Sequence, residues 1–417
     1  MKEKTILFVM PRLPFPMTSG RKTSLYHYCR ILSVDLGYRL IVAAFMEKDD
    51  NKDLIPDFID RLIILPKPSR KTKVFNVFVN SCLLKNRPLQ VSLYWNKDAK
   101  KIIDLLVLEE KPDIVIADMV RTTEYIKYIN AYRIADLDDR ISLRYKRQME
   151  SDMESINPYG AYLSTLPQLF QKVLLWKPIK KRIMHSEAQL LYTYEISIGK
   201  TCDATIFVAQ AEADTFNYEI GYKKAVAIPI GVDVNYFNKC LYNKNTHYIG
   251  FLGAMNVSHN ESAVINFIEN IFPYVLKKMP LAIFMVIGGG VSERLNRYKS
   301  NNIVFTNRVI DVRDYLCKCS VFVCPMTFGS GIKTKNLEAM SMKLPVVTTS
   351  IGAENINAIS GRDWLITDDN VQFANYIIDL LNNKKLCEEI GTNARNFILS
   401  HYVWNVAREN FTKLLHK

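Results

Sequence analysis

Two glycines, two lysines and a glutamate lie close together in the last third of the chain. Gly329 and Gly331 allow a loop to approach a ligand without side-chain clashes, and a helix is expected to follow. The free N–H groups and the dipole at the start of that helix favour phosphate, and Lys333 and Lys335 add positive charge. Glu338, further along the helix, can accept two hydrogen bonds from a ribose diol. The segment therefore indicates a nucleotide site, although an ordinary surface helix has the same composition.

A second polar cluster follows a predicted strand in the first half of the chain, at residues 135–142. It contains Asp136, Asp138 and Asp139. Three carboxylates in a loop at a strand end can bind a divalent cation or act as a base. Asp138 or Asp139 can equally cap the next helix by accepting backbone N–H bonds. Both interpretations remain open at this point.

Short apolar runs alternate with helical patterns along the chain, which predicts parallel sheets covered by helices. The predicted strands of the first half are 5–10, 39–45, 61–65, 113–117, 132–136, 204–208 and 225–229. Those of the second half are 248–253, 282–287, 302–305, 321–324, 345–348 and 365–366. Residues 238–246 are polar and are interpreted as a linker. We therefore expect an α/β protein with two tandem, Rossmann-like doubly wound domains, and a ligand in the cleft at the carboxyl ends of their strands.

The composition bounds the class of protein. The chain has 417 residues, 48% of them hydrophobic and 23% charged, which suits two or three globular domains. Its formal net charge is +13, from 55 Lys and Arg against 42 Asp and Glu, and favours an anionic partner. The basic residues accompany no recognised nucleic-acid-binding module, so nucleic acid is not an expected partner. The eight cysteines are scattered without zinc-site spacing and are expected to be reduced thiols.

The apolar stretch at residues 5–10 is too short for a signal peptide, and no run of about 18 uncharged apolar residues occurs. A cytoplasmic protein is expected. Two basic clusters adjoin apolar residues: Lys67 to Lys73 precede residues 74–79, and Lys177 to Arg182 follow Trp176. This composition is typical of a helix on an anionic membrane surface. A buried core flanked by solvated lysines explains it equally well.

Residues 324–348 resemble the signature of the retaining GT-B glycosyltransferases of family GT4, in the branch that reads G-x-G-I-K-x-K-x-L-E-A-M-x-x-x-x-P-V-V. Four other stretches agree with that family in order and spacing. They are residues 14–22, 228–233, 251–255 and 309–313. The resemblance thus extends over nearly the whole chain.

The resemblance implies roles for individual residues. It places Glu338 at the donor ribose, the loop and its lysines at the diphosphate, and the donor base beside Asn307 and Arg308. Gly20 approaches the diphosphate from the other domain. The expected donor contacts are Gly20, Gly253, Arg308, Gly329, Ser330, Gly331 and Glu338, and the expected catalytic residues are Lys333, Lys335 and Asp138. His259 follows the first strand of the second domain, where relatives shape the donor pocket, although an exposed histidine beside a helix cap is the simpler interpretation.

One position departs from the family. Many GT4 enzymes carry a glutamate eight positions before the second one, and here that position is Ser330. A neutral hydroxyl does not replace a carboxylate as a strong acceptor from sugar hydroxyls. The donor sugar and the level of activity are therefore left open. The GT-B fold also implies that the last helix, within residues 401–417, packs on the first domain (1–240), while residues 247–400 form the donor domain.

The resulting expectation is a retaining glycosyltransferase, a hexosyltransferase without metal or other cofactor. Its donor would be a UDP- or GDP-sugar, and its acceptor a saccharide or lipid-linked molecule of bacterial surface polysaccharide or glycolipid biosynthesis. The expected location is the cytoplasm, with peripheral contact with an anionic membrane. The alternatives are a nucleotide-sugar 2-epimerase of the same fold and a catalytically degenerate GT-B scaffold subunit.

Overall fold

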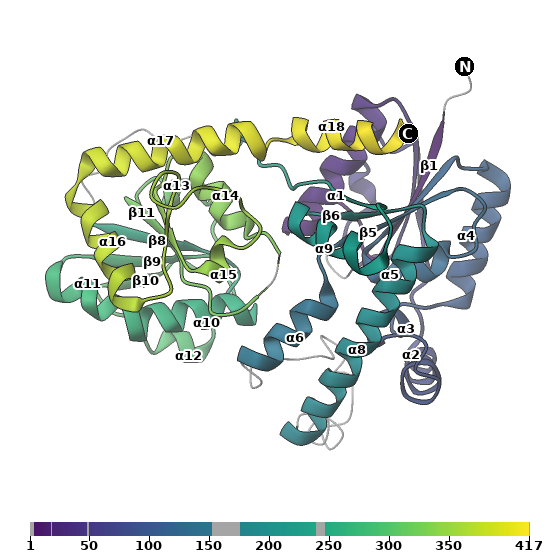
Figure 1. The fold of residues 1–417 in the computed structure, drawn as a ribbon, viewed down its shortest axis with the longest axis horizontal. Helices are drawn as coiled ribbons and strands as arrows, with labels where there is room; N and C mark the ends of the chain where they lie inside the picture. The colour runs from purple at the N-terminus through teal and green to yellow at the C-terminus, as the bar shows by residue number, and fades with distance from the viewer. Residues whose placement is uncertain are drawn as a thin grey trace. The chain divides into compact units, whose positions relative to one another are not determined.

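The computed structural model describes residues 4–17, 19–47, 50–151, 176–238, 247–329 and 331–416, which form two compact units (Figure 1). The amino-terminal unit comprises the described residues up to Met149, those of Pro158–Ile230, and Trp404–Lys417. The carboxy-terminal unit comprises Gly231–Val403 and the described residues of Glu150–Asn157. Each unit is an α/β structure around an all-parallel sheet, which confirms the predicted fold class.

The sheet of the amino-terminal unit has seven strands in the order β3-β2-β1-β4-β5-β6-β7. The strands are β1 Thr5–Met10, β2 Arg39–Ala44, β3 Arg61–Ile64, β4 Ile114–Asp118, β5 Tyr132–Asp138, β6 Ala204–Phe207 and β7 Ala225–Ala227. The helices are α1 Gly20–Arg30, η1 Ile31–Asp35, η2 Lys52–Leu54, α2 Arg70–Asn76, η3 Val77–Leu83, α3 Leu89–Ser92, α4 Lys97–Glu110, α5 Met119–Ile126, α6 Ile141–Ser151, α8 Lys177–Thr201, α9 Gln210–Ile220 and α18 Trp404–Leu415.

Two hydrophobic layers cover the faces of this sheet. Alternate residues of β1 enter different layers, with Ile6 and Phe8 in one and Leu7 and Val9 in the other. Because successive side chains of a strand point to opposite faces, a strand covered on both sides is apolar throughout. This is why the central strands of the sheet appear in the sequence as short, uninterrupted apolar runs.

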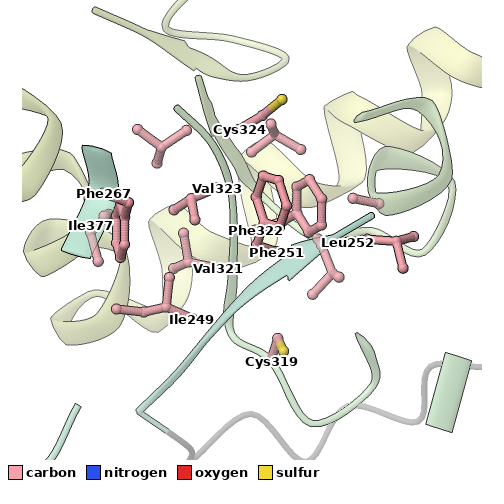
Figure 2. Close-up of a cluster of buried hydrophobic side chains, with 14 of the residues drawn as sticks. Ile249, Phe251, Leu252, Phe267, Cys319, Val321, Phe322, Val323, Cys324 and Ile377 are labelled. Atoms are coloured by element: carbon pink, nitrogen blue, oxygen red, sulfur yellow. The ribbon is translucent and has the colours of Figure 1, made fainter. Parts of the chain in front are cut away.

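The carboxy-terminal unit has a six-stranded sheet in the order β10-β9-β8-β11-β12-β13. Its strands are β8 Tyr248–Leu252, β9 Ile283–Ile287, β10 Ile303–Phe305, β11 Val321–Cys324, β12 Val346–Thr348 and β13 Leu365–Ile366. Its helices are η5 Tyr236–Asn238, α10 Ser258–Asn266, η6 Phe267–Ile271, α11 Phe272–Lys278, α12 Glu293–Asn296, α13 Arg313–Leu316, α14 Thr334–Ser341, α15 Ser350–Ala353, α16 Asn370–Asn382 and α17 Lys384–His401. Figure 2 shows part of its core, where Phe251 of β8 lies beside Phe322 of β11.

All thirteen predicted strands occur, and their ends differ from the prediction by at most two residues. The largest extension is in β5, which continues to Asp138 through a β-bulge. An apolar sequence pattern does not distinguish polar residues at the end of a strand from loop residues. This explains why the prediction ended β5 two residues too early. Most of the predicted linker, residues 239–246, lies outside the described residues, as does Cys240. Leu174 and Leu175, the apolar residues just before Trp176 in the second basic cluster, also lie outside them. Over the part of the chain that the structure describes, no helix is long and apolar enough to cross a membrane.

Candidate functional site

The carboxy-terminal unit has a topological switch point between β8 and β11. From β8 the strands proceed outward to β9 and β10, and the chain then returns to β11 on the other side of β8. The loops after β8 and β11 therefore diverge, and ligands of doubly wound sheets bind at such a point. The glycine- and lysine-containing segment found in the sequence is the loop after β11 together with α14.

The loop after β11 bends at Gly329 and Gly331, whose φ angles of 140° and 70° favour glycine. Lys333 is buried at the N-cap position of α14, and its Nζ donates to the carbonyl oxygen of Gly331 at 2.7 Å. The loop therefore encloses a positive charge beside the start of the helix. Lys333 makes no side-chain capping bond. Ser330 lies outside the described residues.

Lys335 joins α14 to α10, and through it to the loop after β8. Its Nζ donates to Oδ1 of Asn260 at 2.5 Å and lies 4.2 Å from the centre of the Phe251 ring. The Asn260 amide in turn donates to the carbonyl oxygen of Ala254 at 2.9 Å. Burial lowers the pKa of Lys335 to about 8, because the ammonium loses hydration. Lys335 is thus held at the switch point, and its ammonium group loses its proton only slightly above neutral pH.

Glu338 lies one turn further along α14. Burial raises the pKa of its carboxyl to about 7, and the nearby Lys335 opposes that rise. Near pH 7 this group is therefore present both as a carboxylate, which accepts two hydrogen bonds, and as an acid, which donates one.

Three glycines after β9 pack against the neighbouring loops. Gly288 has a φ angle of 133°, and a Cβ atom there would lie 2.0 Å from the Gly253 carbonyl oxygen. A Cβ atom on Gly289 would lie 3.3 Å from Cβ of Arg308. The loops after β8, β9 and β10 are thus in close contact, and Gly253 and Arg308 are two of the residues that form this contact. The glycines were not among the predicted site residues, although a run of three directly after a predicted strand was a usable signal.

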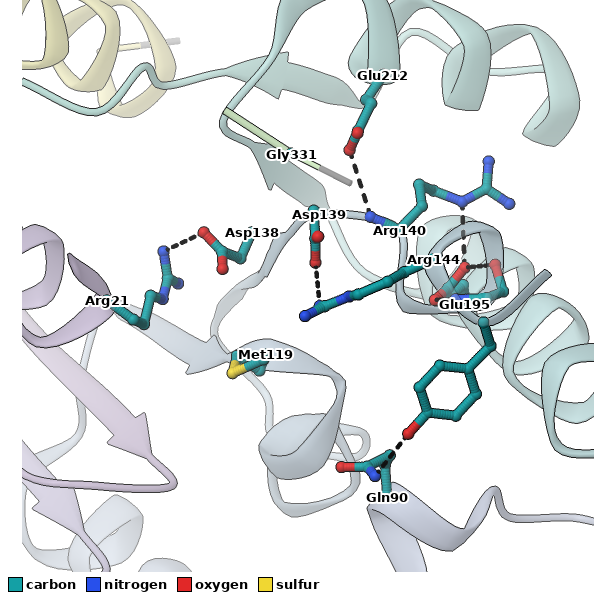
Figure 3. A network of polar contacts seen from close by, with 12 residues as sticks. Arg21, Gln90, Met119, Asp138, Asp139, Arg140, Arg144, Glu195, Glu212 and Gly331 are labelled. Atoms are coloured by element: carbon teal, nitrogen blue, oxygen red, sulfur yellow. Dashed lines mark hydrogen bonds and ion pairs between the residues drawn. The ribbon is translucent and has the colours of Figure 1, made fainter. Parts of the chain in front are cut away.

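The amino-terminal unit has its own switch point, between β1 and β4, and a charged cluster lies there (Figure 3). Arg21, the second residue of α1, contacts Asp118 at the end of β4 and both Asp136 and Asp138 in β5. Its Nη2 is 2.7 Å from Oδ2 of Asp136, its Nη1 is 2.9 Å from Oδ1 of Asp138, and its Nε is 3.0 Å from Oδ1 of Asp118. Arg21 directly follows Gly20.

One guanidinium here faces three carboxylates. Burial raises the pKa of Asp136 to about 7; Arg21 opposes this rise, while Asp118 and Asp138 add to it. Burial also raises the pKa of Asp138, again opposed by Arg21. The side chain of Asp138 is 23% exposed, whereas those of Asp118 and Asp136 are 0% and 1% exposed. Asp138 is therefore the member of this cluster that an external ligand can reach.

The acidic segment at residues 135–142 is paired with arginines. Asp138 contacts Arg21, and Asp139 accepts from Nη2 of Arg144 at 2.6 Å. Within the described ranges, no group of three or more His, Cys, Asp or Glu side chains is arranged to hold a metal ion.

Three further polar side chains lie outside these clusters and contact distant parts of the sequence. Glu195 accepts from the Arg140 side chain and from the backbone and hydroxyl of Ser142, so its role in the fold is structural. Glu187 accepts from the backbone N–H groups at the start of α3, and burial raises its pKa to about 8. The His259 ring meets the Phe328 ring edge-on, with centroids 6.4 Å apart.

The predicted site residues are thus divided between the two units. Gly20 and Asp138 belong to the amino-terminal unit, and the others that the structure describes belong to the carboxy-terminal unit. Gly253, Gly331, Lys333 and Lys335 gather around the β8–β11 switch point, Glu338 continues α14, and Arg308 lies beside the loop after β9. Arg21 and Asn260, which organise the two charged groups, were missed as functional residues.

The carboxy-terminal unit matches a known family. Residues 246–383 fit the family described as Glycosyl transferases group 1. This segment is a glycosyltransferase domain. It contains the β8–β11 switch point and all of α14, so the proposed nucleotide contacts of this unit lie inside the matched region.

Curated relatives cover part of this chain. An uncharacterized 44.6 kDa protein in the cps region of Klebsiella pneumoniae is 30% identical over 237 residues, which are 54% of this chain and 59% of the relative. The capsular polysaccharide biosynthesis glycosyltransferase CapM of Staphylococcus aureus is 27% identical over 130 residues, which are 30% of this chain and 34% of the relative. The chain therefore spans less than two-thirds of the length of these relatives.

A solved structure extends the likeness to both units. Anabaena HepE in complex with UDP and glucose has a TM-score of 0.64 to this chain at 14% identity, and 100% of each chain is covered. At this identity the likeness shows the fold alone. The two parallel-sheet units thus have the GT-B fold.

Proposed function

We propose that the protein is a retaining glycosyltransferase, a hexosyltransferase that transfers a sugar from a UDP- or GDP-sugar to a saccharide or lipid-linked acceptor. The proposed setting is bacterial surface polysaccharide or glycolipid assembly in the cytoplasm. The relatives support this setting, since one is a capsular polysaccharide glycosyltransferase and another is encoded in a cps region. HepE, whose structure holds UDP and glucose, makes UDP-sugars the first donors to test.

The observation that carries the proposal is the group formed by Lys333, Lys335 and Glu338 at a switch point inside a group 1 glycosyltransferase domain. The start of α14 provides N–H groups and the positive end of a dipole for a diphosphate. Two ammonium groups beside it stabilise the charge that develops when the nucleoside diphosphate leaves. Glu338, in its ionised form, accepts from the ribose hydroxyls.

The sugar-transfer step requires that the bond between the anomeric carbon and the diphosphate oxygen breaks and that a bond to the acceptor oxygen forms. The acceptor hydroxyl gives its proton to the departing diphosphate, which leaves with the bonding electrons. In a retaining transfer the acceptor attacks from the face that the diphosphate leaves. We assign the acceptor to the amino-terminal unit, where the partly exposed Asp138 accepts a hydrogen bond from the attacking hydroxyl and orients it.

A donor screen tests the function. The protein is incubated with UDP- and GDP-sugars, with and without candidate acceptors, and the nucleotide and sugar products are separated. Acceptor-dependent release of nucleoside diphosphate, with the anomeric configuration of the donor kept in the product, is the expected result. Isomerised donor without acceptor would assign the chain to the epimerases, and no turnover with any donor would favour the scaffold. Activity is expected to persist in EDTA, because the proposed diphosphate site relies on lysines and a helix dipole.

A further inference from the structure

The segment formed by α2 and η3, residues 70–83, has its polar and apolar faces reversed relative to an ordinary surface helix. Asn76 and Ser81 point into the amino-terminal unit and are buried. The Asn76 amide donates to the carbonyl oxygens of Ser92 and Trp95, at 3.2 and 2.8 Å, and the Ser81 hydroxyl lies 2.9 Å from that of Ser92. The helix is therefore attached to the unit by hydrogen bonds through its polar side.

The apolar side of the same segment faces outward. Its exposed residues are Val74, Phe75, Phe78 and Leu83. Together with the exposed Leu84, which directly follows η3, they are called here the apolar face. Phe75 and Phe78 are 65% and 59% exposed. The spacing of residues 74, 75 and 78 places them on one side of a helix. Single exposed apolar residues need no explanation, but a contiguous group that includes two phenylalanines marks an interaction surface.

The charges along the chain on both sides of the apolar face are all positive. Residues 61–97 contain eight Lys and Arg and no Asp or Glu. Lys67, Arg70, Lys71 and Lys85 are exposed and flank the apolar face on both sides along the chain. In a protein interface, cations of this density would need an equally acidic partner. An anionic bilayer provides both an apolar interior and a negative surface, and basic amphipathic helices with exposed aromatics bind there.

The start of α8 has the same composition, since the exposed Trp176 is followed by Lys177, Lys181 and Arg182, all exposed. Tryptophan is enriched at the membrane–water interface because its ring is apolar and its N–H is polar. α2 and α8 both belong to the amino-terminal unit (Figure 1). Two helices of one unit therefore carry the combination of exposed aromatic and basic residues.

We propose that α2 and η3 bind the surface of an anionic lipid bilayer. The apolar face enters the boundary between headgroups and acyl chains, while the flanking Lys and Arg contact lipid phosphates. This inference is independent of the donor and the acceptor, because it concerns exposed side chains outside the residues assigned to sugar transfer.

Vesicle sedimentation tests the proposal on the full chain. Binding is expected to vesicles that contain phosphatidylglycerol, to be weak on phosphatidylcholine alone, and to fall as salt is raised. The double variant Phe75→Ser with Phe78→Ser removes the aromatic part of the apolar face and is expected to lower binding about tenfold or more. Arg70→Gln with Lys71→Gln is expected to lower binding to anionic vesicles about tenfold and to leave binding to neutral vesicles unchanged.

Matched controls test whether binding requires this surface or only an exposed apolar or basic residue anywhere on the chain. Leu105 and Leu108 are also exposed, but they lie on α4 beside Glu109 and Glu110. The variant Leu105→Ser with Leu108→Ser is expected to bind vesicles as the wild type does, as is Lys223→Gln. Thermal unfolding of each variant verifies that it is folded.

Three outcomes would overturn the proposal. The first is that the wild type binds neither kind of vesicle. The second is that the Phe75 and Phe78 variant binds as well as the α4 control. The third is self-association of the wild type without vesicle binding, abolished by the same two substitutions, which would assign the apolar face to a second copy of the chain.

Discussion

At the scale of single residues, Arg21 faces three carboxylates at the β1–β4 switch point. Arg21→Met would leave these carboxylates without their counter-charge in a buried place. We expect the free energy of unfolding to fall by about 3–5 kcal/mol, the range found when one partner of a buried ion pair is removed. Arg21→Lys keeps the charge, loses the multiple hydrogen bonds, and is expected to lose less stability.

The pH dependence of that loss identifies its cause. The pKa of Asp136 in the folded protein, about 7, is above its ordinary value of 3.8. Between these two values the folded chain binds more protons than the unfolded chain, so this group lowers stability as pH rises. Without Arg21 the carboxylates ionise less readily still. Urea unfolding at about pH 5 and about pH 8 should therefore show a larger destabilisation at the higher pH. An equal loss at both would exclude this electrostatic origin.

Glu338 and Lys335 predict a pH optimum for nucleotide binding. Their pKa values are about 7 and about 8, respectively. Affinity for UDP is expected to rise as Glu338 loses its proton and to fall as Lys335 loses its charge. Titration with UDP across this range checks the profile. Glu338→Gln should remove the rise at low pH, and Lys335→Met should remove the fall at high pH; an unchanged profile in both variants would contradict the site.

Substitution by alanine separates binding from chemistry at the same site. Glu338→Ala is expected to weaken UDP binding about 10- to 100-fold, because hydrogen bonds to a charged group are lost. Lys333→Ala with Lys335→Ala should mainly slow transfer, with a smaller loss of UDP affinity, because the full charge on the leaving diphosphate develops during the reaction. Steady-state kinetics with the donor found in the screen would measure both effects.

At the scale of elements, the contact between the loops after β8 and β9 depends on Gly288. A side chain there would meet the backbone oxygen of Gly253 and would adopt a φ angle of 133°, which only glycine adopts readily. Gly288→Ala is therefore expected to move the loop and to lower both stability and UDP affinity. Gly37→Ala is a useful control, since its φ angle is also positive but a Cβ atom there meets nothing within 4 Å. A change in UDP affinity confined to Gly288→Ala would confirm the role of the loop.

The elements were largely predictable, whereas the contacts between them were not. Buried parallel strands such as β8 and β11 are short apolar runs bounded by polar residues, and that pattern is local in the sequence. The Lys335–Asn260 contact joins residues 75 positions apart, and the Arg21–Asp118 contact joins residues 97 positions apart. The hydrophobic periodicity of the sequence does not predict which distant residues form such pairs. The resemblance to family GT4 identified residues 324–348 as the segment of the proposed nucleotide site. It did not identify the residues that contact the lysines of this segment, such as Asn260.

At the scale of the whole molecule, the two ends of the chain fold together. α18, the last helix, places Ala407, Phe411 and Leu414 in the same hydrophobic layer as residues of β1 and α1. The Trp404 ring stacks on His27 with centroids 4.0 Å apart, and the Asn410 amide donates to the carbonyl oxygen of Ala227 at 2.9 Å. The amino-terminal unit therefore lacks part of its core until α18 has been synthesised.

Removal of residues 404–417 tests this dependence. Since one face of the sheet would lose part of its cover, we expect the amino-terminal unit to lose amide protection in β1, β2 and α1, measured by hydrogen exchange, while β8 and β11 keep theirs. Phe411→Ala is a smaller change in the same place and should reduce the free energy of unfolding of this unit by about 3–5 kcal/mol. Lys413→Ala, on the exposed side of the same helix, should leave it nearly unchanged. If the truncated chain kept full protection in β1 and β2, α18 would be a surface attachment and not a part of the core.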